Sequence, residues 1–284
     1  MFDLITRISS YGSVWVRQAM VLLAAVALLA GCARGKAMHR ETAPVKDPRS
    51  YVQGGIVRGD CAQKKIALVF TGGAYGEGSE HILDVLARRN IKAGFFVTGD
   101  FLRQEAHHPF LRRMAKESHY LGPHSDSHPL YCPWEDRNKT LVTKEFFKED
   151  LQKNIDDLKV FGAMQDAGPI YFIPPYEWYN EDQSEWSKEM GVVLFNFTSG
   201  SGSNRDWIPE DHPKFASSQA ILEGVLEYEQ KDPDGLNGFL LLLHLGAQRE
   251  DKMFLLLEPL LEELTKRGYE FIRMDKMLSN PLKR

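Results

Sequence analysis

The sequence predicts an α/β protein, built as a distorted (β/α)7-type barrel. From Ile66 onward, strand and helix patterns alternate about seven times. The predicted strands are continuous apolar runs, which is typical of parallel strands that are covered on both faces. The composition shows no break after Ile66, so one large domain is favoured over two small ones. A doubly wound open sheet is the alternative architecture.

Each element follows from its local pattern. Short apolar runs bounded by polar or turn residues predict strands at 65–70, 91–99, 119–125, 169–173, 192–198, 238–246 and 269–274. Apolar residues at helical spacing, with capping residues such as Thr143, predict helices at 79–90, 105–118, 144–162, 181–191, 217–232 and 251–268. The strands and helices therefore follow one another as βα units along the whole domain.

The N-terminus reads as an export signal rather than as part of the fold. Arg7 and Arg17 precede the apolar run "MVLLAAVALLAGC", which has signal-peptide length. Its end, Leu-Ala-Gly-Cys, resembles the lipobox of bacterial lipoproteins, which implies lipidation at Cys32 and a membrane partner through that anchor. An ordinary secretory signal is the alternative. We expect a signal peptide over 1–31, a polar tether over 32–55 and the domain over 56–284, located outside the cytoplasm on the cell envelope, with the outer membrane favoured.

The overall composition narrows the class of protein. The chain has 284 residues, of which 43% are hydrophobic, enough for a sizeable core. A net charge of -4 provides no basic surface for nucleic acid. Cys61 and Cys132 are expected to be two separate thiols.

Residues that can carry chemistry follow the predicted strands. In barrels of parallel strands, the functional groups lie where strands end and loops begin. The third strand is followed by His124 and His128, and the strand at 238–246 carries His244 near its end. Three imidazoles at one rim indicate a functional site. The alternatives are that His124 and His128 only form hydrogen bonds within their own loop, and that His244 is a core residue.

Four ordered motifs resemble those of the polysaccharide deacetylases, carbohydrate esterase family four. "HSDSH" fits the family's second motif, and "IPPY" fits the third except that Ile173 replaces an arginine. The pair Asp206-Trp207 fits the fourth motif, and "LLLLH" fits the fifth. The resemblance covers most of the chain after Ile66 and implies the family's barrel.

The first motif departs from the family pattern. The family has Thr-Phe-Asp-Asp-Gly, in which one Asp is the general base and the other completes an Asp-His-His metal site. Aligning Phe70 with the motif's Phe places Thr71 and Gly72 at the two Asp positions, and neither Gly73 nor Ala74 supplies a carboxylate. The chain therefore resembles a divergent branch with a degenerate first motif.

The resemblance implies a metal-dependent removal of acetyl groups from a glycan. A zinc ion would activate water and polarise the amide carbonyl, with His124 and His128 as two of its ligands. His244 is the candidate acid. Asp206 is its partner, and a backbone N–H near Tyr176 would stabilise the oxyanion.

The missing carboxylates call for substitutes. Glu177 is the favoured surrogate base and Asp126 the favoured surrogate ligand, with Asp100 and Glu77 as alternatives. Aromatic and apolar residues after the strands are expected to bind the sugar, namely Pro175, Tyr176, Trp178, Tyr179 and Trp207. Packing alone is the alternative role for the aromatic residues.

Two functions remain open. The first is a lipid-anchored, zinc-dependent deacetylase that acts on an acetylated glycan. The second is a catalytically impaired glycan-binding lipoprotein on the same fold. Because Gly72 occupies the usual ligand position, an Asp at Gly72 is expected to raise the affinity for metal in either case.

Overall fold

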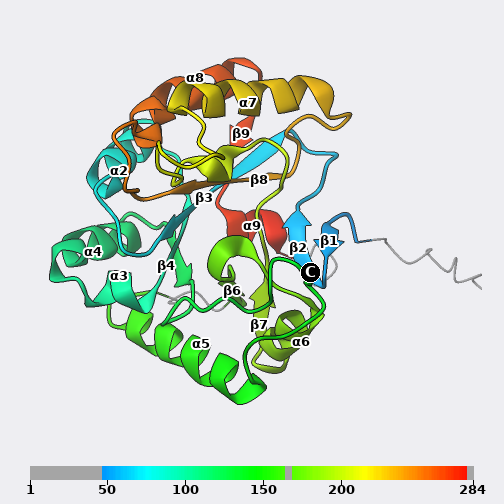
Figure 1. The fold of residues 1–284 in the computed structure, drawn as a ribbon. Coiled ribbons are helices and arrows are strands. Elements are labelled where there is room, and N and C mark those ends of the chain that lie inside the picture. Colours follow the sequence, from blue (N-terminus) through cyan, green and yellow to red (C-terminus); the bar gives the residue numbers. More distant parts are fainter. Residues whose placement is uncertain (1–46, 164–167, 280–284) are drawn as a thin grey trace, which may run out of the picture. The chain divides into compact units, whose positions relative to one another are not determined.

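A parallel sheet of five strands lies at the centre of the part of the chain that the computed structural model describes, residues 47–163 and 168–279 (Figure 1). Four of its strands lie in the order β5-β4-β3-β8, and β9 pairs with the beginning of β3. All of these pairings are parallel. The strands are β3 (Lys65–Gly72), β4 (Gly94–Val97), β5 (Tyr120–Pro123), β8 (Phe239–His244) and β9 (Glu270–Phe271).

Two smaller sheets complete the strands of the described residues. One pairs β6 (Ile170–Phe172) with β7 (Val192–Leu194) in parallel. The other is an antiparallel hairpin of β1 (Ser50–Val52) and β2 (Gly55–Arg58). The predicted α/β class is confirmed, and the ladders of the described residues form three sheets.

The two faces of β3 belong to different parts of the core. Leu68 and Phe70 pack in a large cluster with the helices, whereas Ala67 and Val69 pack in an interior cluster with Phe96 and with residues of β8. This division follows from the strand geometry, in which successive side chains point to opposite faces. Both faces are covered, as the continuous apolar runs indicate.

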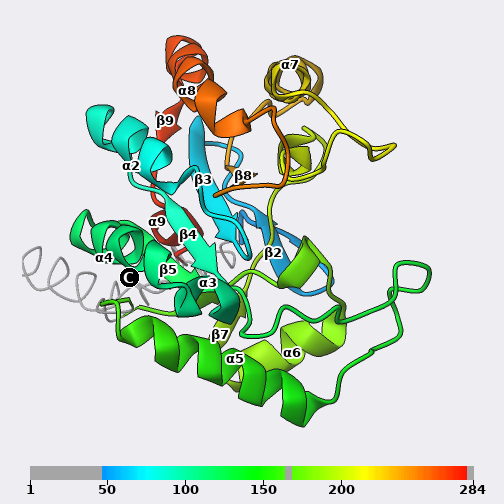
Figure 2. The ribbon, with the colours of Figure 1, turned by 60° about the vertical axis from the view of Figure 1, so that its left-hand side comes forward.

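Helices cover the outer face of the sheet (Figure 2). Their apolar stripes pack in the large cluster against the strands, which explains why each sequence pattern is amphipathic. These helices are α2 (Ser79–Arg88), α4 (His108–Lys116), α7 (Ser218–Lys231) and α8 (Leu257–Lys266).

The helices α5 (Lys144–Lys159) and α6 (Glu181–Glu189) lie side by side and pack with β6 and β7 (Figures 1 and 2). Thr143 caps α5, because its side chain accepts a hydrogen bond from the amide of Phe146. The remaining short helices are α3 (Gly99–Arg103), α9 (Met274–Leu278), η1 (Glu105–His107), η2 (Pro175–Glu177), η3 (Ser203–Arg205) and η4 (Met253–Leu256).

The expected tether is wrong at its C-terminal end. Residues 50–58 form the hairpin of β1 and β2, and the hairpin is bound to the body of the domain. The hydroxyl of Tyr179 donates to the carbonyl oxygen of Val52 at 2.7 Å, and Ser184 Oγ donates to that of Gln53 at 2.5 Å. These long-range hydrogen bonds cannot be inferred from a polar, Pro-containing segment.

The predicted signal peptide over 1–31, Cys32 and the tether up to residue 46 lie outside the described residues. Within residues 47–163 and 168–279, Cys61 and Cys132 are free thiols. None of the helices in these two ranges is long and apolar enough to cross a membrane.

Candidate functional site

A cleft of about 860 Å³ opens over the ends of the strands. Parallel strands bring their carboxyl ends to one edge, so side chains from distant segments meet there. Thr71 comes from β3, and His244 ends β8 directly beside it in the ladder. The other polar residues at its floor are His124, His128 and Glu177.

The two neighbouring histidines lie together, as their spacing suggests. The rings of His124 and His128 have centroids 4.9 Å apart. His124 Nδ1 donates to the carbonyl oxygen of Ile173 at 2.8 Å, which leaves its Nε2 with a lone pair. Burial lowers the pKa of His124 well below its ordinary value and that of His128 to about 4, so both imidazoles are neutral.

A carboxylate from α5 holds the loop that carries these histidines. Asp150 is buried and accepts hydrogen bonds from the hydroxyl of Ser125, from the amide of Asp126 and from the amide and hydroxyl of Ser127. Ser125 and His128 both have positive φ angles, of 72° and 53°. Asp150 therefore stabilises a loop conformation that its own residues disfavour.

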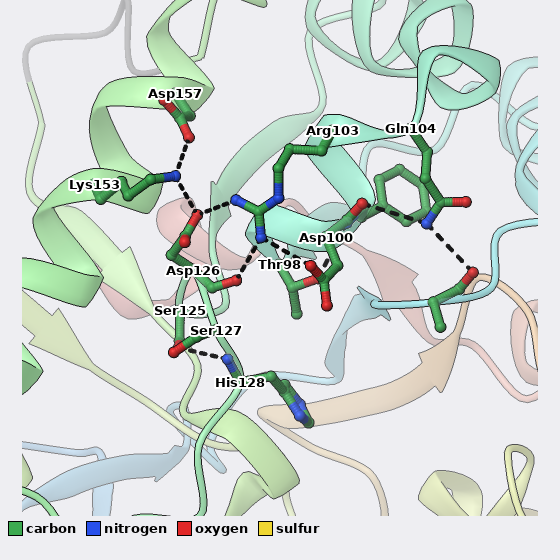
Figure 3. Close-up of polar contacts among 12 residues, drawn as sticks. Thr98, Asp100, Arg103, Gln104, Ser125, Asp126, Ser127, His128, Lys153 and Asp157 are labelled. Atoms are coloured by element: carbon green, nitrogen blue, oxygen red, sulfur yellow. Dashed lines mark hydrogen bonds and ion pairs between the residues drawn. The ribbon is translucent and has the colours of Figure 1, made fainter.

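Asp126 does not join the histidines, so the expectation of a surrogate ligand is wrong. Its carboxylate accepts from Arg103 Nη1 at 2.7 Å and from Lys153 Nζ at 2.8 Å, on the opposite side of the loop from His128 (Figure 3). Burial raises its pKa, but the two cations outweigh this effect and the pKa is lowered. Both cations contact the same carboxylate oxygen, Oδ1.

Glu177 reaches the site through a strained turn. Tyr176 and Glu177 follow one another with φ angles of 57° and 52°, a conformation that costs non-glycine residues about 1–3 kcal/mol each. Asn196 Nδ2 donates to the carbonyl oxygen of Glu177 at 2.7 Å and holds the turn. As a result, Glu177 Oε1 lies 3.9 Å from His124 Nε2, and its side chain is only 9% exposed.

The environment of Glu177 changes its protonation. Burial raises the pKa of Glu177, the charge of His244 lowers it and the charge of Asp206 raises it, with a net pKa of about 7. A carboxyl group with such a pKa can exchange a proton near neutral pH. Glu177, the predicted surrogate base, thus lines the cleft beside the histidines.

Asp206 forms two hydrogen bonds with His244. Its Oδ1 lies 2.6 Å from His244 Nδ1, and its Oδ2 accepts the backbone amide of His244 at 2.8 Å. Burial lowers the pKa of His244, but the charge and hydrogen bond of Asp206 and the charge of Glu177 outweigh burial and raise it. The imidazole is thereby oriented with its Nε2 free to act.

Exposed aromatic side chains line the cleft. Tyr176 is 42% exposed and Trp207 is 47% exposed, and both were expected to bind sugar. Trp134 and Tyr75 line the same cleft with comparable exposure. Tyr75 follows β3, so its place after a strand was the signal that could have identified it. Flat, exposed rings beside polar groups can stack on the apolar face of a sugar ring.

Three residues that were expected to bind substrate do not line the cleft. Tyr179 is fully buried and its hydroxyl donates to the β1–β2 hairpin, so its role is structural. Trp178 Nε1 donates to the carbonyl oxygen of Pro133, and Arg137 lies over its ring at 4.3 Å. Pro175, the first residue of the turn, is buried. These expectations are wrong because only one residue of the turn, Tyr176, is exposed at the surface.

One wall of the cleft carries basic residues that sequence reasoning missed. Arg205, His212 and Lys214 line it, all from the loop that follows η3 or from η3 itself. Arg205 donates to the carbonyl oxygens of Lys214 and Phe215, which folds this loop back on itself. No motif marks them, because their proximity depends on this fold of the loop.

The donor set does not fit the Asp-His-His metal site that the resemblance implies. His124 keeps the arrangement of a metal-ligating histidine, with one nitrogen donating to a carbonyl and the other free. However, no three His, Cys, Asp or Glu side chains within residues 47–163 and 168–279 converge in a way that could hold a metal ion. Two imidazoles are present, and the third ligand is missing.

We predict that Asp150→Asn lowers the free energy of unfolding by about 1.5–3 kcal/mol, because hydrogen bonds to a charged acceptor are lost and an amide N–H faces the donors of the loop. Urea denaturation measures the change. Asp156→Asn on the exposed side of the same helix is the control and should stay within about 0.5 kcal/mol of the native chain. Equal effects of the two variants would contradict the role of Asp150.

Comparisons with known proteins identify similar sequences. The family model described as polysaccharide deacetylase matches residues 58–195. An uncharacterized 30.6 kDa protein in the fumA 3' region of Geobacillus stearothermophilus is 31% identical over 138 residues, which are 49% of this chain and 48% of that protein. A peptidoglycan-N-acetylglucosamine deacetylase of Bacillus cereus is 25% identical over 82% of this chain and 95% of its own length.

Solved structures share the fold. The wild-type BA3943 protein of Bacillus anthracis, described as a pseudoenzyme of carbohydrate esterase family four, superposes with a TM-score of 0.63 at 19% identity, over 81% of this chain and 70% of that chain. A mutant of the same protein, with the same TM-score, is described as having restored enzymatic activity. The ordered motifs, the family model matched over residues 58–195 and the common fold agree: this part of the chain is similar to the polysaccharide deacetylases, carbohydrate esterase family four.

Proposed function

We propose that the chain removes acetyl groups from a polysaccharide. The observation that carries this proposal is the pair of Glu177 and His244, a buried carboxyl and a partly buried imidazole that both line an aromatic-lined cleft. Hydrolysis of an acetamide needs a base for the attacking water and an acid for the leaving amine. These two groups supply both, and each is close enough to shift the pKa of the other.

Each group has a defined part in the reaction. Glu177 accepts a proton from the attacking water, and His244, oriented by Asp206, donates a proton to the leaving nitrogen. Thr71 Oγ1 is buried without a hydrogen-bond partner among the described residues, and it lies beside His244 in the ladder. Its hydroxyl is therefore available to donate to the carbonyl oxygen as charge develops there.

The substrate is an acetylated glycan of the cell envelope. Exposed rings of Tyr176, Trp207 and Trp134 suit the stacking of sugar rings in an extended cleft. The relative from Bacillus cereus is a peptidoglycan-N-acetylglucosamine deacetylase, so peptidoglycan is the first glycan to test. Zinc on His124 and His128 would supply Lewis-acid chemistry in the family pattern, but the missing third ligand leaves the steps above to the chain's own groups.

A glycan-binding protein without turnover is the second candidate. The observation that favours it is the presence of Thr71 and Gly72 at the two positions where the first motif of the family carries carboxylates. Both candidates predict saturable binding of acetylated oligosaccharides in the cleft. Only the first predicts release of acetate.

Replacing either acid–base group should abolish turnover. We expect Glu177→Gln and His244→Asn each to lower the rate of acetate release by about 10²–10⁴-fold, since each removes one proton transfer. The assay uses N-acetylated peptidoglycan fragments and chitooligosaccharides. Glu149→Gln, an exposed carboxylate on α5, is the matched control and should retain the native rate. No acetate release by the native chain, with binding intact, would favour the second candidate.

The pH profile should report the His244–Asp206 pair. His244 acts as an acid only when it is protonated, so kcat/KM should fall as the pH rises through its raised pKa. Asp206→Asn removes the charge and hydrogen bond that raise this pKa, so the alkaline limb of the profile should move to lower pH. The profiles of the native chain and of Asp206→Asn are measured over the same pH range. If the alkaline limb does not move in Asp206→Asn, Asp206 is not the group that raises the pKa of His244.

We also propose that the chain acts outside the cytoplasm, anchored by lipid at Cys32. The lipobox-like end of the apolar N-terminal run motivates this proposal. In cells that express the full chain, Cys32→Ser should release the protein from the membrane fraction. Retention of the variant in that fraction would contradict lipid anchoring at this residue.

A further inference from the structure

The two faces of β3 decide where a missing metal ligand belongs. Residues of β3 alternate between the helix-side cluster, which contains Phe70, and the interior cluster, which contains Val69. Continuing this alternation places Thr71 and Gly73 on the interior face and Gly72 on the helix side. The motif alignment, which gives Gly72 the ligand position, does not show this.

The surroundings of Gly72 agree with the helix-side position. A Cβ atom on Gly72 would lie 2.8 Å from Leu245 Cδ1 and 3.0 Å from the ring of Phe101. Both neighbours belong to the helix-side cluster. An aspartate at this position would push its carboxylate into an apolar layer, away from the histidines. On this geometry, an Asp at Gly72 is not expected to raise the affinity for metal.

Position 73 lies in the same row as the first histidine. Thr71 pairs with Phe96, and Phe96 pairs with Gly122, across three adjacent parallel strands. Two residues farther along each strand, the row continues with Gly73, Thr98 and His124. Adjacent strands lie about 4.8 Å apart, so Gly73 and His124 are separated by roughly 10 Å between Cα atoms. An aspartate, an imidazole and two metal–ligand bonds of about 2 Å each can span that gap.

Gly73 also has room for a side chain. The nearest atom to a Cβ placed there is Thr98 Cγ2, at 4.0 Å. Its φ angle lies outside the left-handed region, so an L-residue is tolerated without backbone strain. Gly73 lines the same cleft as His124 and His128.

We infer that Gly73 is the vacant third-ligand position of a two-histidine metal centre, and that the native chain consequently binds a divalent metal only weakly. An aspartate at Gly73, with His124 and His128, would form an oxygen–nitrogen–nitrogen set suited to zinc or cobalt. The inference concerns metal affinity alone and stands whether or not the native cleft turns over a glycan.

Titration of the full chain with zinc alone tests the inference. We expect Gly73→Asp to bind one zinc per chain with an affinity at least about 10–100-fold above that of the native chain. Gly72→Asp should show no such gain, and His128→Ala in the Gly73→Asp background should abolish it. Cobalt in place of zinc gives a visible spectrum that reports the ligand geometry without any activity measurement.

Three results would overturn the inference. The first is native binding of one zinc as tight as that of Gly73→Asp. The second is an equal gain in Gly72→Asp. The third is a Gly73→Ala chain that unfolds at markedly lower urea concentration than the native chain, because the inference requires free space at this Cβ. Acetate release is measured separately. A loss of acetate release bears on the proposed function and does not decide the inference about metal affinity.

Discussion

Parallel pairing along both edges of β3 is the constraint on which the rest of the structure depends. Val69, Phe70 and Thr71 have neighbours in register on both β4 and β8, so each of their side chains is committed to one face. A slip by one residue would exchange the helix-side and interior sets, and would send Thr71 into the apolar layer. The same parallel alignment collects the ends of β3, β5 and β8 at one edge, where the cleft opens.

The site is built in two layers. Around the cleft, neutral imidazoles, a buried carboxyl and the His244–Asp206 pair provide the reactive groups. Behind them, Asp150 and Asn196 hold the backbone of the loops on which these groups stand. These two residues do not react themselves, but their hydrogen bonds keep the buried polar site ordered. A buried polar group without a hydrogen-bond partner would lower the stability of the fold.

Much of this arrangement follows from local sequence patterns. The order of strands and helices follows from hydrophobic periodicity, and the meeting of His124, His128 and His244 follows from their places at strand ends. Long-range partners account for the failures. Asp126 is held by Arg103 and Lys153, 23 and 27 residues away, and no local rule shows that these cations reach it.

The same limit applies to the turn after β6 and to the first motif. Tyr179 belongs to the core because the β1–β2 hairpin, more than a hundred residues earlier, accepts its hydroxyl. Motif alignment equates residues by order along the chain, whereas the face that a residue occupies depends on the ladder. The grouping of the described strands into three sheets likewise depends on pairing between distant segments, which local patterns do not contain.

The loop of His124 and His128 is held by Asp150 and by the cations bound to Asp126, and none of these contacts involves a metal. Loop conformation and metal occupancy are thereby uncoupled. Glycine codons that end in a pyrimidine differ from an aspartate codon by a single base, so an aspartate at the end of β3 can be lost or regained in one mutational step while these loop contacts remain. Such a scaffold is free to move between catalysis and binding over evolutionary time without passing through an unstable intermediate.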